Sequence, residues 1–257
     1  MFNVGITDKC VNELHPMLRN IVVLTGAGVS AESGLRTFRA DDGLWEEHRI
    51  EDVCTPAAFA RDPRLVHQFY DARRTRAAEV EPNPAHHALA RLEAEWEGDF
   101  LLVTQNVDSL HERAGSKRLI HMHGKLDSGW CLACGERFPW LGSMSPSGNI
   151  CPLCKVEGQV RPDIVWFGEM PYEMDRIEAA LMNADLFVSI GTSGAVYPAA
   201  GFVQTARYCG ARTIEINLEP SLGSVFFDEA RIGPAGVEVP KWVDEMLQSA
   251  QSSPMSS

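Results

Sequence analysis

Short apolar runs alternate with amphipathic stretches along the chain. Four runs rich in branched or aromatic apolar residues end in Gly or polar residues, as buried parallel strands do; they cover 20–25, 100–106, 184–192 and 213–220. Helical patterns lie between them, at 83–96 and 172–183. A further helix is expected over 62–80, where Asp62 can act as the N-cap and Pro63 fits the first turn. This alternation predicts an α/β fold with a doubly wound parallel sheet, whose ligands bind beyond the carboxyl ends of the strands.

The composition and the net charge indicate which classes of partner the protein disfavours. Hydrophobic residues make up 45% and charged residues 23% of the chain, which is ordinary for a globular protein. The formal net charge of −12 opposes nonspecific attraction to nucleic acid and to anionic lipid. The apolar runs are too short to span a membrane, and the N-terminus lacks the apolar core of a signal peptide. We therefore expect a cytoplasmic protein with no membrane partner and no specific nucleic-acid partner.

Four of the seven cysteines form two close pairs. Cys131-x2-Cys134 and Cys151-x2-Cys154 are separated by 16 residues, which is the spacing of a four-thiolate zinc site. The segment 124–160 around them has too little apolar periodicity to build a core, and zinc would supply on the order of 10 kcal/mol. Four thiolates leave no open coordination position, so the expected ion is structural. A zinc ribbon that binds nucleic acid is the alternative, but basic residues are few here.

A Gly-rich turn follows the first predicted strand. Gly26, Gly28 and Ala31 fit the pattern G-x-G-x-x-G/A, which brings backbone N–H groups close to a pyrophosphate. A dehydrogenase of this type should next have a strand that ends in Asp or Glu about 20 residues on. The sequence there, GLWEEHRIED, does not have the pattern of a buried strand. The turn therefore predicts nucleotide binding without hydride transfer, and a turn with no ligand is the alternative.

Polar side chains also follow later strands. Gln105, Asn106 and Asp108 come at the end of the second run, where they can orient a nucleotide or cap the next helix. His121 and His123 alternate on a strand-like segment, so only one is expected to face the crevice. Histidine suits proton transfer near neutral pH, and a structural role is the alternative. The other histidines are expected on the surface, in helix packing or in turns: His15, His48, His67, His86, His87 and His111.

Six motifs in order resemble one enzyme family. They are GAGVSAESGLRTFR (26–39), TQNVDSLHERAG (104–115), HMHG (121–124), VWFGE (165–169), GTS (191–193) and NLEP (217–220). Over about residues 20–240 the chain resembles the sirtuins, the Sir2 family of NAD-dependent protein lysine deacylases. It is most similar to the bacterial class III members, whose eukaryotic relatives remove acidic acyl groups. Many sirtuins have Pro where this chain has Arg36, and the bacterial class III members resemble this chain there.

The resemblance implies that NAD is bound and consumed as a co-substrate. It makes His123, directly before Gly, the general base, places Asn106 and Asp108 in the nicotinamide pocket, and gives His123 and Asn106 as catalytic residues. Phe38 would guard the reactive face; from the residues alone Phe38 could be a core aromatic and Arg39 a surface charge. The implied NAD contacts are Gly26, Ala27, Gly28, Ala31, Glu32, Phe38, Arg39, Trp45, Gln105, Asn106, Val107, Asp108, Gly191, Thr192, Ser193, Asn217, Leu218, Glu219 and Ala235.

The resemblance also implies how an acylated lysine is bound. Tyr70 and Arg73 lie three residues apart on one helical face, and class III sirtuins have this pair to hold succinyl, malonyl or glutaryl carboxylates. Periodicity alone gives a packed Tyr70 and an exposed Arg73, like Arg74 and Arg76. The substrate peptide would pair with an extended edge, for which a core strand is the alternative; its residues are Val165, Trp166, Phe167, Gly168 and Glu169.

These expectations combine into one architecture and one reaction. A Rossmann-like doubly wound parallel sheet would be formed by 1–40, 81–123 and 161–257, a helical insertion by 41–80, and a small zinc-binding domain by 124–160. The expected monomer would remove succinyl, malonyl and acetyl groups from lysines of acylated proteins. It would release nicotinamide and O-acyl-ADP-ribose. A protein ADP-ribosyltransferase and an NAD-sensing adaptor without catalysis are the alternatives.

Overall fold

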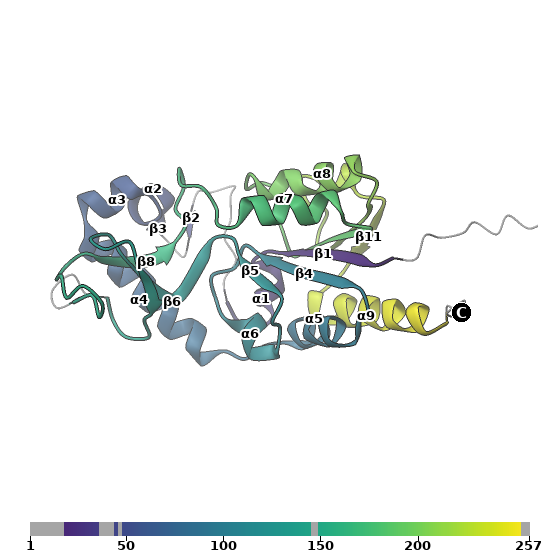
Figure 1. The fold of residues 1–257 in the computed structure, drawn as a ribbon, viewed down its shortest axis with the longest axis horizontal. Helices are drawn as coiled ribbons and strands as arrows, with labels where there is room; N and C mark the ends of the chain where they lie inside the picture. Colours follow the sequence, from purple (N-terminus) through teal and green to yellow (C-terminus); the bar gives the residue numbers. More distant parts are fainter. Residues whose placement is uncertain (1–17, 36–43, 46–47, 145–148, 253–257) are drawn as a thin grey trace, which may run out of the picture.

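A six-stranded parallel sheet forms the centre of the computed structural model, which describes residues 18–35, 44–45, 48–144 and 149–252 (Figure 1). Its strands are β1 (Asn20–Thr25), β4 (Asp99–Thr104), β5 (Leu119–His121), β9 (Leu186–Ile190), β10 (Arg212–Asn217) and β11 (Glu229–Ile232). The spatial order β11-β10-β9-β1-β4-β5 is the 3-2-1-4-5-6 order of dinucleotide-binding sheets. The strand order therefore reverses between β1 and β9, where such sheets bind their ligands.

Helices cover both faces of this sheet, because successive strand residues point to opposite sides. Ile21 and Val23 of β1 pack with one helix layer, and Val22 and Leu24 pack with the other. The first layer contains α5 (Pro84–Glu95) and α9 (Ala235–Ser252), and the second contains α7 (Met174–Met182) and α8 (Phe202–Tyr208). Figure 1 shows the two layers on either side of β1 and β4. The predicted doubly wound α/β class is confirmed.

The four predicted strands are present, but two strands of the sheet were not predicted. β5 has three residues, and β11 is an edge strand whose burial alternates between half-buried and exposed. Neither contains the continuous apolar run that marks a buried parallel strand. Three of the four observed strands end earlier than predicted, β4 at Thr104, β9 at Ile190 and β10 at Asn217, so the polar residues that follow lie in loops.

The chain between β1 and β4 is mainly helical, as expected. The described elements are α1 (Gly28–Ala31), β2 (Leu44–Trp45), β3 (His48–Arg49), α2 (Ile50–Val53), α3 (Pro56–Arg61) and α4 (Pro63–Glu79). Asp62 caps α4 by accepting a hydrogen bond from the N–H of Leu65 at 3.0 Å, which confirms the predicted helix start. The sequence GLWEEHRIED forms no buried strand in its described part: β2 and β3 have two residues each and pair only with each other.

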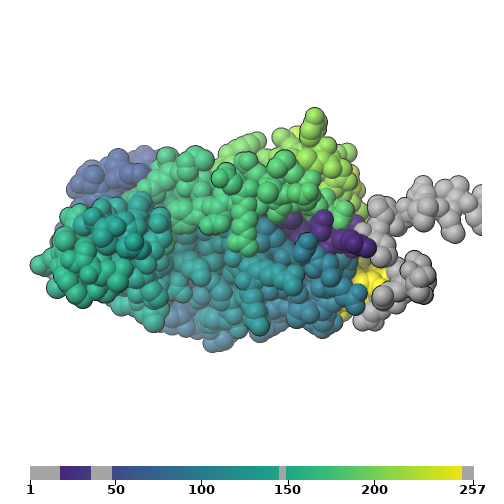
Figure 2. All heavy atoms as spheres, in the orientation of Figure 1, coloured from purple at the N-terminus to yellow at the C-terminus, as the bar shows by residue number. Residues whose placement is uncertain are grey.

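A second, antiparallel sheet lies toward one end of the molecule (Figure 1 and Figure 2), and Cys131, one of the four paired cysteines, ends one of its strands. It contains β7 (Arg137–Pro139), β6 (Gly124–Cys131) and β8 (Val160–Ile164) in that order. This small sheet extends to Ile164, beyond the expected module end at residue 160. Its inner residues and those of the insertion form a shared core that includes Val66, Tyr70, Leu126 and Trp166.

The remaining described elements are short. They are α6 (Leu110–Ala114) and two 3-10 turns, η1 (Ala199–Gly201) and η2 (Ser224–Phe226). None of the helices within the described ranges is long and apolar enough to cross a membrane.

Candidate active site

The Gly-rich turn after β1 lies against the turn after β9, at the point where the strand order reverses. The N–H of Gly28 donates to the Gly191 carbonyl at 2.8 Å, and the N–H of Gly26 donates to the Ile190 carbonyl at 3.0 Å. A Cβ on Gly28 would lie 2.7 Å from the Gly191 Cα, and Gly191 has φ +63. These glycines are therefore required where two backbones meet, whether or not a phosphate also approaches them.

Polar side chains fill the space beneath this turn. Asn106 donates from Nδ2 to the Ser30 hydroxyl at 3.1 Å, and that hydroxyl donates to Asp108 at 3.2 Å. Asp108 also accepts from the N–H of Leu110 at 3.1 Å, so its carboxylate joins Ser30 of the Gly-rich turn to the start of α6. Burial raises the pKa of Asp108, while the two hydrogen bonds oppose that shift. Ser30, a polar residue inside the glycine motif, was not predicted as part of the site.

Two histidines of this region, His86 and His111, were not predicted to belong to the site. His86 and His111 are fully buried, with ring centroids 4.8 Å apart, under the Gly-rich turn. His86 contacts the Ser30 hydroxyl through Nε2 at 3.4 Å, and His111 contacts Thr25 through Nε2 at 3.0 Å. Burial lowers the pKa of His86 to about 4 and that of His111 well below its usual value. Helix packing was one expected role for them; a polar network under the site was not expected.

The HMHG segment runs beside the loop after β4. The N–H of Met122 donates to the Thr104 carbonyl at 3.1 Å, and His121 and His123 bind the carbonyls of Asn106 and Gln105 through Nδ1 at 3.0 and 3.2 Å. The regular strand ends at His121, so His123 lies in the turn before β6. The structure thus brings together His123 and the loop that carries Asn106.

Hydrogen bonding distinguishes the two histidines as possible bases. Both ring nitrogens of His121 are occupied by protein oxygens, the Asn106 carbonyl and, at 2.9 Å, the Glu112 carboxylate, so neither points toward a substrate. Burial alone would raise the pKa of Glu112, but hydrogen bonds from His121 and Lys125 lower it to about 2, which keeps it an acceptor. These contacts favour His123 over His121 as the candidate base, a distinction that the sequence alone did not offer.

His123 has the arrangement that a general base needs. Its Nδ1 faces the Gln105 carbonyl and therefore carries the proton of the neutral ring, which leaves the Nε2 lone pair to accept another proton. Burial lowers the pKa of His123, partly offset by the hydrogen bond to Gln105. The ring is therefore neutral near pH 7.

The other predicted nucleotide contacts gather at the ends of β9 and β10. Asn217 donates from Nδ2 to the Thr192 carbonyl at 2.7 Å and so joins the two loops. Ala235 is buried at the start of α9, where Glu32 accepts from the N–H of Gly236 at 2.8 Å. In the loops after β9 and β10 the exposed predicted contacts are Ser193, Leu218 and Glu219, and Glu32 is exposed as well. Phe38 and Arg39 lie outside the described residues, as does the side chain of Trp45.

Tyr70 and Arg73 lie together inside the insertion. The Tyr70 ring is fully buried, and its hydroxyl is 3.3 Å from the Cys54 sulfur. The Arg73 guanidinium lies 3.2 Å from the Phe69 ring centroid and donates to the Phe69 carbonyl at 3.0 Å. Periodicity predicted an exposed arginine, but Arg73 is only 7% exposed.

The same correction applies to Arg74, while Arg76 is exposed as predicted. Arg74 is buried because α4 lies under the zinc module, where this side chain donates to the carbonyls of Leu126 and Gly142. Periodicity within one helix cannot show a covering element that comes from another part of the chain.

The segment 165–169 follows β8 and connects three parts of the site. The N–H of Val165 donates to the His123 carbonyl at 2.9 Å, and that of Phe167 to the Cys54 carbonyl at 3.0 Å. The chain then turns at Phe167 and Gly168, and Gly168 has φ +92. Phe167 is 47% exposed, whereas Trp166 is buried. The segment is therefore a turn beyond the core strand, and its pairing with a peptide stays a prediction.

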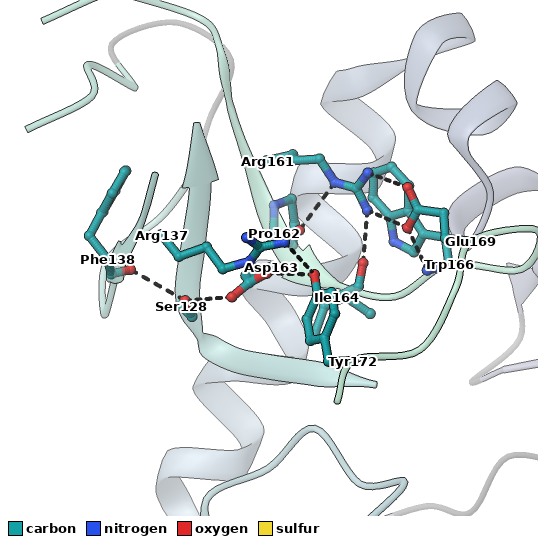
Figure 3. A network of polar contacts seen from close by, with 10 residues as sticks. All are labelled: Ser128, Arg137, Phe138, Arg161, Pro162, Asp163, Ile164, Trp166, Glu169 and Tyr172. Carbon is teal, nitrogen blue, oxygen red and sulfur yellow. Dashed lines mark hydrogen bonds and ion pairs between the residues drawn. The ribbon is translucent and has the colours of Figure 1, made fainter. Parts of the chain in front are cut away.

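Glu169 is held inside this turn by Arg161, as Figure 3 shows. The two side chains form a bidentate pair, with distances of 2.7 and 3.0 Å from the guanidinium nitrogens to the two carboxylate oxygens. Glu169 also accepts from the N–H of Trp166 at 2.8 Å. Its carboxylate is thus a support for the turn, a role that the sequence did not indicate.

The four paired cysteines form a compact sulfur cluster. The ligand atoms of Cys131, Cys134, Cys151 and Cys154 all lie within 4.8 Å of one another, with Sγ–Sγ distances of 3.7 and 3.8 Å across two pairs. Sulfurs at tetrahedral positions around zinc would be about 3.8 Å apart. The cluster therefore fits one structural zinc ion, as predicted, with all four positions taken by thiolates.

Comparison with known proteins gives one consistent result. Residues 26–198 match the sequence profile of the Sir2 family. The chain is 59% identical over 234 residues to an "NAD-dependent protein deacylase" of Bdellovibrio bacteriovorus, covering 90% of this chain and 98% of that protein. It is 53% identical over 247 residues to the protein of the same name from Escherichia coli, covering 95% and 88%.

Solved structures agree with these relatives. A complex of a Sir2 homologue with NAD superposes with a TM-score of 0.83 at 38% identity, covering 91% of each chain. Sir2Af2 bound to a myristoylated histone peptide superposes with a TM-score of 0.71 at 32% identity, covering 94% of this chain and 96% of that one.

Proposed function

The chain belongs to the Sir2 family, and from this premise we propose that it is an NAD-dependent protein lysine deacylase that removes succinyl, malonyl and acetyl groups. The names of its relatives support protein deacylation. The geometry of His123 supports the catalytic part of the proposal most directly. A neutral imidazole with Nδ1 bound to a carbonyl and Nε2 available is a ready general base beside the Asn106 loop.

The proposed reaction is the one that the family resemblance implies, and the arrangement of the site supports it. NAD, as a substrate, supplies a ribose carbon from which nicotinamide can leave. The loops after β1, β4, β9 and β10 orient the nucleotide, with Asn106 and Asp108 at the nicotinamide, so that the acyl-lysine oxygen attacks this carbon. This attack joins the lysine amide to the ribose as an imidate. His123 then deprotonates a ribose hydroxyl, which attacks the imidate carbon. Water completes the release of free lysine and O-acyl-ADP-ribose.

The acidic acyl preference rests on Tyr70 and Arg73. A carboxylate that reaches this buried pair meets a phenol donor and a guanidinium where water screens little. An acetyl group has no carboxylate and gains nothing from the pair. The structure of Sir2Af2 with a myristoylated histone peptide supports acylated proteins as the class of partner.

The compartment, the oligomeric state and the domain division are further parts of the proposal. The cytoplasm is the proposed compartment, because the zinc site needs four reduced thiols. A monomer is the proposed state, and light scattering tests it. The proposed division has a nucleotide-binding sheet, a helical insertion and a zinc module.

Product analysis tests the function against its alternatives. The protein is incubated with NAD and with succinyl and acetyl forms of one peptide, and all products are identified and quantified by mass spectrometry. A deacylase gives free lysine, nicotinamide and O-acyl-ADP-ribose in equal amounts. His123→Ala abolishes the release of free lysine and O-acyl-ADP-ribose and the nicotinamide release coupled to it, because the base acts after nicotinamide has left. ADP-ribose attached to protein would instead identify an ADP-ribosyltransferase. Unchanged NAD would identify a binding protein and overturn the proposal.

A further inference from the structure

Trp166 lies in the segment expected to meet the peptide, yet its side chain faces the interior. The residue is only 2% exposed. Its indole Nε1 donates a hydrogen bond to the Tyr70 hydroxyl at 3.0 Å. The indole therefore contacts the Tyr70 hydroxyl, the proposed acyl-binding group, within the protein interior, while the neighbouring Phe167 faces solvent.

Two other residues fix the position of this indole. The Arg161 guanidinium lies 3.4 Å from the centroid of the Trp166 ring, and Glu169 binds both that guanidinium and the backbone N–H of Trp166 (Figure 3). Arg161 also donates to the Ile164 carbonyl at 2.8 Å, which ties the group to the end of β8. The side chain of Arg161 is 4% exposed and that of Glu169 is 24% exposed, so the guanidinium side of the pair is shielded from water and from salt.

The bond from Trp166 decides what the Tyr70 hydroxyl can do. An indole is only a donor, so the phenol oxygen must accept from it and must direct its own proton elsewhere. Among the described contacts of this hydroxyl, the Cys54 sulfur, 3.3 Å away, is a weak acceptor, whereas an entering carboxylate is a strong one. Burial raises the pKa of Tyr70 well above its usual value, so the phenol keeps that proton at working pH.

We propose that Trp166 is a positioning residue for acidic acyl groups, which aims the Tyr70 proton at the acyl carboxylate and is itself held by Arg161 and Glu169. This inference rests on the proposed function and deepens it. A neutral acyl group offers no carboxylate to that proton. Trp166 should therefore affect the discrimination between acyl groups more than the chemical step.

The test compares Trp166→Phe with the parent enzyme on succinyl and acetyl forms of one peptide. Phe keeps a ring against Arg161 but removes the donor. The expected result is a fall of about three- to tenfold in the succinyl-to-acetyl ratio of kcat/KM. The fall should come mainly from a higher KM for the succinyl peptide. Trp140→Phe is the matched control, because that indole donates to the Ser143 carbonyl in the zinc module and should leave the ratio unchanged.

A double-mutant cycle with Tyr70→Phe separates positioning from general support of the fold. If Trp166 acts through the phenol, Trp166→Phe changes the ratio less than about twofold once that hydroxyl is gone. If Trp166→Phe melts at too low a temperature to be assayed, Glu169→Gln is the second variant. It keeps the Trp166 side chain but weakens the contacts that fix its position, and the succinyl-to-acetyl ratio is again expected to fall.

Each other outcome is decisive. Equal loss on both peptides, or the same fall in the Tyr70→Phe background, would overturn the positioning role. A parent enzyme that consumes no NAD with either peptide would instead overturn the proposed function itself.

Discussion

Replacing Arg73 by Met tests how acidic acyl groups are recognised. Met keeps an unbranched stem over the Phe69 ring and removes only the guanidinium, which lies 3.2 Å from that ring centroid. Arg73 is 7% exposed and lies next to the buried Tyr70 on α4. A succinyl carboxylate would therefore lose a charged partner in a place where water cannot replace it.

The size of the loss follows from this burial. Hydrogen bonds to charged groups contribute about 1.5–3 kcal/mol, and an exposed ion pair contributes about 0–1 kcal/mol. Because the Arg73 guanidinium is shielded, we expect the upper part of the first range, about 2–3 kcal/mol. That is a loss of roughly 30- to 150-fold in kcat/KM for the succinyl peptide. Deacetylation should change by less than about threefold, since an acetyl group does not use the charge.

The assay measures kcat/KM for succinyl and acetyl forms of one peptide at saturating NAD. Arg76→Met is the control, because Arg76 lies one turn further along α4, is exposed, and pairs only with Glu79 among the described contacts. It should leave both activities unchanged. Equal losses on both peptides in Arg73→Met would refute the assignment of Arg73 to the acyl carboxylate.

Three further predictions concern the base, the metal and the central turn. Because burial lowers the pKa of His123 and the neutral form is the base, kcat/KM should be flat above pH 7 and fall only at acidic pH; an inflection above 6.5 would contradict this. Cys151→Ala should abolish the bound zinc, measured as one ion per chain in the parent, and lower the melting temperature steeply; an unchanged melt would exclude a structural ion. Gly28→Ala should lower the free energy of unfolding in denaturant by about 1–3 kcal/mol, because its Cβ would lie 2.7 Å from the Gly191 Cα. Gly142→Ala, which has open space around it, is the neutral control. Equal stabilities of the two variants would contradict a close contact between the turns.

Local signals in the sequence predicted the elements that local interactions determine. The start of α4 follows from the Asp62 side chain and from Pro63, both within one turn of the helix. The zinc cluster follows from two short cysteine spacings, because each pair only has to close a tight loop around one ion. The parallel strands follow from apolar runs that are buried on both faces.

Interactions between distant segments account for what the sequence did not predict. Arg74 is buried because a loop about 70 residues later, at Gly142, covers it. The Ser30, His86 and His111 cluster combines three segments, and each of its members has an ordinary helical or turn pattern. Trp166 was expected at the peptide because of its motif, but its indole lies behind Tyr70.

A crystal structure with NAD and a succinylated peptide analogue would test the central claim most directly. The account predicts that Nε2 of His123 lies within hydrogen-bonding distance of a ribose hydroxyl, with the acyl carboxylate against the Tyr70 hydroxyl and the Arg73 guanidinium. An imidazole far from the sugar, or an acyl carboxylate held elsewhere, would contradict it.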